Sequence, residues 1–97
     1  MEFLQISHFS GRVNEAFSVD VDGHSVVFTL LEVLPMPAHA VPDGVREPFA
    51  LLFRNEAAVV FPQRIYAMTN ASMGEVGIFL VPVARDRDGF LYQAVFN

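Results

Sequence analysis

Residues 15–34, EAFSVDVDGHSVVFTLLEVL, decide the fold class of this chain. Apolar and polar residues alternate from Phe17 to Val21, which is the two-residue period of a half-buried strand. Asp22-Gly23 follows, and an Asp-Gly pair accepts the positive φ angles of a tight hairpin turn. We therefore predict an antiparallel β-hairpin whose second strand is His24–Leu34.

The second strand of this hairpin is predicted to lie in the middle of a sheet, because both of its faces are apolar. Strict alternation places Glu32 on the same face as Phe28 and Leu30. A buried carboxylate without a partner costs several kcal/mol. We expect Glu32 to form a structural ion pair with Arg54 or Arg64, and a functional charged site is the alternative.

Further strands are predicted by the same alternation and by the turn residues that separate them, at 49–54, 63–69, 75–84 and 90–96. Pro82 indicates an edge position or a β-bulge within 75–84. Residues 4–13 are ambiguous and fit a short helical turn, with Ser7 as its N-cap and Gly11 as its stop. Residues 35–48 contain four prolines and are expected to form a long connector.

Strands separated by turns, without a sizeable helix between them, are typical of all-β proteins. We predict a single small antiparallel barrel or sandwich of about six strands, preceded by the short N-terminal helical turn. A second hydrophobic core would need about 40 or more further residues. The chain of 97 residues is therefore expected to be one all-β domain, 1–97.

The composition argues against several classes of partner and location. The net charge is −5, and the six basic residues are scattered arginines, so nucleic acid is not an expected partner. Polar residues or proline interrupt each apolar stretch early, so no membrane span is predicted. The N-terminus lacks the basic and apolar regions of a signal peptide, and there is no cysteine, so a cytoplasmic location is expected.

Apolar residues make up 53% of the chain, which is a high share for a small globule. Monomeric proteins seldom expose apolar patches larger than a few hundred Å². We therefore expect the surplus to be buried against a second copy of the chain or against another protein.

No residue pattern points to catalysis, a metal or a cofactor. His8, His24 and His39 stand apart without the spacing of a metal site. Residues 20–23 and 86–89 superficially resemble calcium loops but lack the remaining oxygen ligands, and hairpin turns explain them. His39, with Asp43 and Glu47 nearby in the long connector, is the candidate for a polar site.

Five sequence patterns resemble those of one bacterial family of small all-β proteins of unknown function. They are PFALLFR at 48–54, PQRIY at 62–66, FLVPV at 79–83, Asp88-Gly89 and YQAVFN at 92–97. The match spans nearly the whole chain and also includes the turn Met73-Gly74. The resemblance implies no catalytic residues. It implies an assembly or accessory role near phage-tail-like collar and fibre proteins. Within PQRIY, Arg64 departs from the family pattern, which has a small residue at this position.

Three functions are therefore compared. The favoured one is a non-catalytic interaction or assembly module. The alternative is a small-ligand-binding β-barrel that uses the barrel mouth or the connector. An enzyme is the least favoured, since it would require histidine or carboxylate groups to converge in one cleft. The candidate ligand or partner contacts are His39, Glu32, Arg54, Arg64 and Tyr66.

Overall fold

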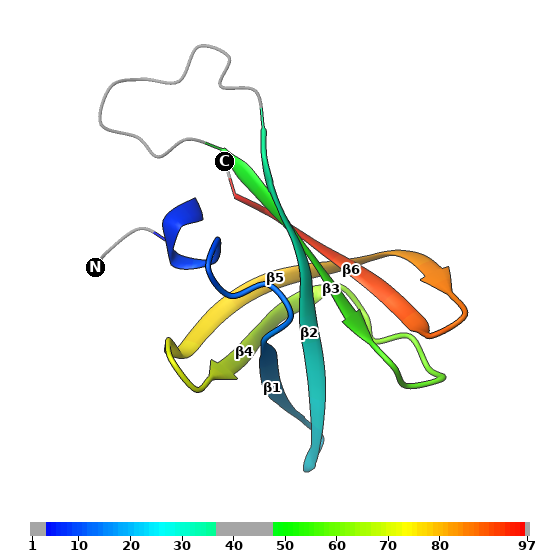
Figure 1. Cartoon of the computed structure of the whole chain (residues 1–97). Coiled ribbons are helices and arrows are strands. Elements are labelled where there is room, and N and C mark those ends of the chain that lie inside the picture. The colour runs from blue at the N-terminus through cyan, green and yellow to red at the C-terminus, as the bar shows by residue number, and fades with distance from the viewer. Residues whose placement is uncertain (1–3, 37–47, 97) are drawn as a thin grey trace.

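A closed antiparallel β-barrel is the architecture of the chain (Figure 1). The computed structural model describes residues 4–36 and 48–96. The strands are β1 Ala16–Val21, β2 His24–Pro35, β3 Phe49–Asn55, β4 Arg64–Asn70, β5 Gly74–Asp86 and β6 Gly89–Phe96. Their order around the barrel is β1-β2-β3-β6-β5-β4. The predicted all-β class is confirmed, and the barrel replaces the sandwich that the sequence left open.

The hairpin that decides the fold class has the predicted turn. Asp22 and Gly23 both have positive φ, at 51° and 86°, and Val21 pairs with His24. The backbone N–H of Gly23 donates to the carboxylate of Asp20 at 2.9 Å. β2 pairs with β1 on one side and with β3 on the other, so its predicted central position is confirmed.

A β-bulge in β2 overturns the prediction for Glu32. The register with β3 shifts between Leu30 and Glu32. The residues after the bulge therefore face the opposite side from the one that strict alternation predicts. Phe28 and Leu30 point into the core, whereas Glu32 lies on the outer wall and is exposed. The expected burial of this carboxylate is wrong, and with it the ion pair to Arg54 or Arg64 that burial would require.

A second bulge occurs at the proline of β5. The register with β6 shifts between Pro82 and Ala84, as the predicted bulge requires. β5 lies between β6 and β4 in the strand order, and it pairs with β4 from Gly74 to Leu80 and with β6 from Val81 to Asp86.

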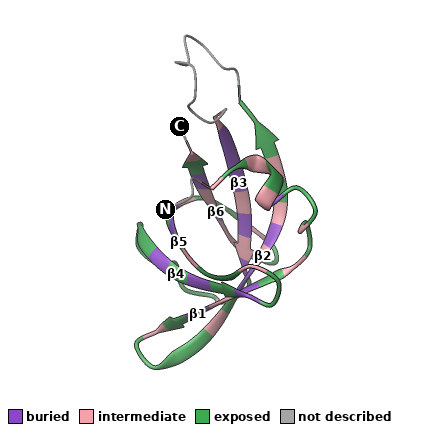
Figure 2. Ribbon diagram, turned by 90° about the vertical axis from the view of Figure 1, so that its left-hand side faces the viewer, coloured by how far each residue is buried: buried purple, intermediate pink, exposed green. Residues whose placement is uncertain are grey.

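Aromatic side chains fill the barrel. Figure 2 shows buried and exposed residues alternating along the strands, as a wall with one apolar side requires. Phe28 meets the ring of Tyr92 edge-on at 5.1 Å, and Phe17 meets Phe53 in the same way at 5.3 Å. The largest fully buried side chains are Tyr66, Tyr92, Phe9, Phe17, Phe28, Phe49, Phe53, Leu30, Leu51, Met68, Ile78 and Leu80.

A short 3₁₀ helix, η1 Ile6–His8, carries Phe9 to one end of this core. The ring of Phe9 lies 5.9 Å from those of Phe49 and Phe96 and is fully buried. The N-cap of η1 is Gln5, whose backbone N–H donates to Nδ1 of His8, and Ser7 lies inside the helix. The predicted helical turn is present, but Ser7 as its N-cap is wrong.

The loop of residues 56–63 packs Phe61 against the core. The ring of Phe61 lies 6.1 Å from that of Phe28, and its backbone N–H donates to the Tyr92 hydroxyl at 2.9 Å. The Tyr66 hydroxyl donates to the carbonyl of Pro62. The two tyrosines thus hold this loop to the barrel.

Candidate functional site

The outer wall of β4 and β5 carries two large apolar side chains in direct opposition. Ile65 on β4 pairs with Phe79 on β5, and the next outward pair is Ala67 with Gly77. Ile65 is 70% exposed and Phe79 is 49% exposed. We call these residues, Ile65, Ala67, Gly77 and Phe79, the outer patch.

The outer patch follows from the alternation of these strands. Tyr66, Met68, Ile78 and Leu80 point into the barrel and are buried, so their neighbours must point outward. Gly77 leaves space beside Ile65, because a Cβ added at Gly77 would lie 3.5 Å from Cγ2 of Ile65. The small residues Ala67 and Gly77 therefore project less from the sheet than Ile65 and Phe79 do. Another surface can pack against these two large side chains.

Apolar residues continue from the outer patch toward β6. Val81 is the next outward residue of β5 after Phe79, and it pairs with Gln93 on β6. Val95, two residues further along β6, is also substantially exposed. Val81 is half-buried and Gln93 lies between it and Val95, so Ile65 and Phe79 are the largest exposed apolar side chains of this wall.

The predicted contact Arg54 is engaged in an ion pair within the domain. Its Nη2 lies 2.8 Å from Oδ2 of Asp86, and both side chains are partly exposed. The hydrogen bond from Arg54 is the main cause that lowers the pKa of Asp86, and a backbone hydrogen bond from Asp88 adds to it. The same hydrogen bond raises the pKa of Arg54. The sequence showed 86–89 as a turn but not Asp86 as this partner.

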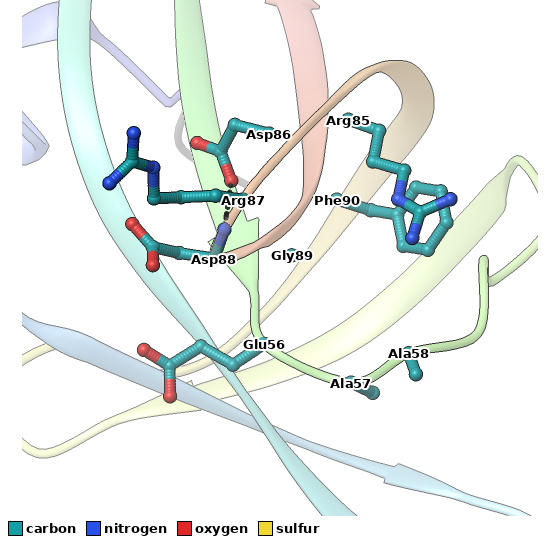
Figure 3. A pocket seen from close by; sticks show the side chains of 9 residues that line it. All are labelled: Glu56, Ala57, Ala58, Arg85, Asp86, Arg87, Asp88, Gly89 and Phe90. Carbon is teal, nitrogen blue, oxygen red and sulfur yellow. Dashed lines mark hydrogen bonds between the residues drawn. The ribbon is translucent and has the colours of Figure 1, made fainter.

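A hollow of about 160 Å³ lies beside this ion pair, where the β5–β6 turn meets Glu56 (Figure 3). The guanidinium of Arg85 lies over the Phe90 ring, 5.6 Å from its centroid. Among the residues that the structure describes, no three or more His, Cys, Asp and Glu side chains gather in a way that could hold a metal ion. The charged groups here stabilise the turn and are not aimed at a common point.

The predicted contacts Arg64 and Tyr66 lie together on β4. The guanidinium carbon of Arg64 is 4.8 Å from the centroid of the Tyr66 ring. Tyr66 is only 2% exposed, and burial is the main cause that raises its pKa. Tyr66 is therefore a core residue that anchors the loop at Pro62, and Arg64 is the exposed group beside it.

The predicted contact residues do not converge on one site. Arg54 is on β3 and Arg64 is on β4, and the order of the strands puts these two on opposite sides of the barrel. Glu32 lies on the outer wall of β2, and His39, with Asp43 and Glu47, falls outside the described residues. The outer patch was missed, although alternation in 64–69 and 75–84 already set Ile65 and Phe79 opposite the buried residues.

No helix within residues 4–36 and 48–96 has the length and apolar character needed to cross a membrane. The family model described as "Domain of unknown function (DUF6916)" matches residues 4–96, so the chain belongs to this family. No curated protein and no solved structure matches the chain.

Proposed function

We propose that this member of the DUF6916 family is a non-catalytic interaction and assembly module that binds protein through its outer patch. The observation that carries the proposal is the opposition of Ile65 and Phe79 on the outside of the barrel, where they are 70% and 49% exposed. Covering such side chains with protein removes apolar area from water, which is the main driving force for association.

The packing of the barrel supports binding on its outside. Fully buried aromatic and aliphatic side chains occupy the interior, which favours the outer wall over the interior as the contact surface. The family resemblance implies an assembly or accessory role near phage-tail-like collar and fibre proteins, and exposed apolar side chains on the outer wall suit such a role. We propose the assembly role on that basis, with a second copy of the chain or another protein as the partner.

The proposal is tested by amide NMR spectra of the ¹⁵N-labelled chain over a wide concentration range. Resonances of Ile65, Ala67, Gly77 and Phe79 are expected to shift and broaden as concentration rises. The double variant Ile65→Thr/Phe79→Thr keeps side chains that suit a strand. It is expected to weaken this association about 10-fold or more, because it removes buried apolar area.

The matched control is Val59→Thr/Val60→Thr. These valines are 59% and 52% exposed, and they lie in the loop of residues 56–63 and not on β4 or β5. The control variant is expected to associate like the unmodified chain. Spectra that do not change with concentration would refute self-association through the outer patch. A loss of association in both double variants alike would refute the assignment of the contact to Ile65 and Phe79.

A further inference from the structure

The seam between β1 and β4 closes the barrel over only two residue pairs. Ser18 pairs with Thr69 and Val19 pairs with Met68, whereas β4 pairs with β5 from Arg64 to Asn70. Within the described residues, the backbone of Arg64–Ala67 is therefore paired with a strand on one side only. In Figure 1 the tip of the β1–β2 hairpin projects beyond the rest of the barrel, which separates the end of β1 from the start of β4.

An open strand edge of this kind is suited to binding another extended strand. Backbone N–H and C=O groups along an open edge are satisfied by another extended strand, which adds to the sheet. Pro62 has no N–H, so pairing along this edge is limited to residues after it. The stretch that can accept a strand is thus Gln63–Ala67, and it ends where Met68 meets β1.

Charge indicates which strand fits this edge. The chain carries a net charge of −5, so two copies can meet closely only where acidic side chains are absent. β4 has no acidic residue, whereas the end of β1 that pairs with β2 but not with β4 carries Asp20. The open edge of β4 also borders the outer patch through Ile65, which is the most exposed large apolar side chain among the described residues.

We infer that the open edge of β4 pairs with β4 of a second copy of this chain, antiparallel and about a twofold axis at Ile65. This inference rests on the proposed assembly function and names its partner. The register sets Ile65 opposite its own copy and Gln63 opposite Ala67 of the partner subunit. It joins the outer patches of both copies into one apolar surface across a continuous sheet, as an isologous interface requires.

Single-cysteine variants test this register, because the chain contains no cysteine of its own. Directly opposed residues of antiparallel strands have Cα separations that a disulfide spans. Under mild oxidation, Ile65→Cys is expected to form disulfide-linked dimers at least ~10-fold faster than Ser25→Cys, which is exposed on the β1–β2 hairpin. A mixture of Gln63→Cys and Ala67→Cys is expected to form the mixed dimer in preference to either symmetric one.

The mass of the unmodified chain by light scattering, measured alongside the cross-linking, separates the possible failures. A concentration-dependent dimer that cross-links at Ile65→Cys, and in the mixed Gln63→Cys/Ala67→Cys pair, supports the β4 pairing. A dimer that cross-links equally well at Ser25→Cys, or in neither arrangement along β4, overturns this pairing and leaves the proposed assembly function standing. A chain that remains a single copy at all concentrations, even if it binds a different protein, overturns the pairing outright.

Discussion

Gly89 has the least room for a side chain among the described glycines. It has a φ of 144°, and a Cβ at this position would lie 2.1 Å from the carbonyl oxygen of Asn55. Gly89 begins β6 beside the end of β3, so the close approach joins the β5–β6 turn to the neighbouring strand. Only glycine fits both the backbone angle and the space.

Gly89→Ala is therefore expected to lower the free energy of unfolding by roughly 3 kcal/mol, from strain and forced displacement of the β3 backbone. Gly74→Ala is the control, because Gly74 also has positive φ, at 76°, but a Cβ there meets nothing within 4 Å. The control is expected to cost only about 1 kcal/mol. Equal losses for the two variants in denaturant titrations would contradict this explanation.

Glu32 shows where residue-level prediction from sequence stops. Alternation assigns a face correctly until a bulge inserts one residue, and then every later side chain changes sides. Leu31 and Val33 are apolar, so the sequence around Glu32 fits either register equally well. The bulge becomes visible only when β2 pairs with β3, and that pairing joins residues far apart in the sequence, such as Glu32 and Leu52.

At the scale of elements, local patterns predicted all six strands. Hairpin turns and two-residue alternation are properties of neighbouring residues, so β1, β2 and the C-terminal strands could be read directly. The 3₁₀ helix was predicted, but with the wrong N-cap. Its N-cap is Gln5, whose backbone N–H donates to the side chain of His8. η1 matters because it places Phe9 in the core. The contact between Phe9 and Phe96 of β6 joins residues far apart in the sequence, so no local pattern predicts it.

Phe9→Ala is expected to destabilise the domain by about 3–5 kcal/mol, because it removes a fully buried ring that contacts three other aromatic rings. Val13→Ala, in the same N-terminal segment but 41% exposed, is expected to change stability by less than about 0.5 kcal/mol. Chemical denaturation of both variants measures the difference. A small loss for Phe9→Ala would mean that η1 does not seal the core.

At the scale of the whole molecule, closure of the barrel could not be predicted. It depends on the β1–β4 seam, which joins Ser18 to Thr69 across about half of the chain. The candidate site could not be predicted for the same reason, because it also depends on long-range strand pairing. Arg54 and Arg64 were both predicted as contact residues, but the strand order puts them on opposite sides of the barrel. Ile65 and Phe79 become a pair only through the β4–β5 register.

The two tyrosines report on the integrity of the whole core. Burial raises the pKa of both Tyr66 and Tyr92, and the chain has no tryptophan and no other tyrosine. The folded state favours their neutral form. Below the unfolded-state tyrosine pKa of about 10, the ionisation of these tyrosines does not change the free energy of unfolding. As the pH rises from there through their raised pKa values in the folded state, the free energy of unfolding falls. Phenolate absorbance is expected to appear at higher pH in the native chain than in the denatured chain.

A native chain whose tyrosines titrate together with those of the denatured chain would contradict the buried, loop-anchoring positions of Tyr66 and Tyr92. Urea unfolding at pH 7 and pH 11 gives the second reading. The free energy of unfolding is expected to be lower at pH 11, in the direction that the raised pKa values require.

We propose that this barrel assembles through its exposed outer wall. Light scattering on a sizing column, with the unmodified chain alone over a wide concentration range, measures this assembly. We expect a mass that rises with concentration toward twice the 10.8 kDa of one chain. A mass that stays at 10.8 kDa at every concentration would contradict self-assembly through β4 and the outer patch.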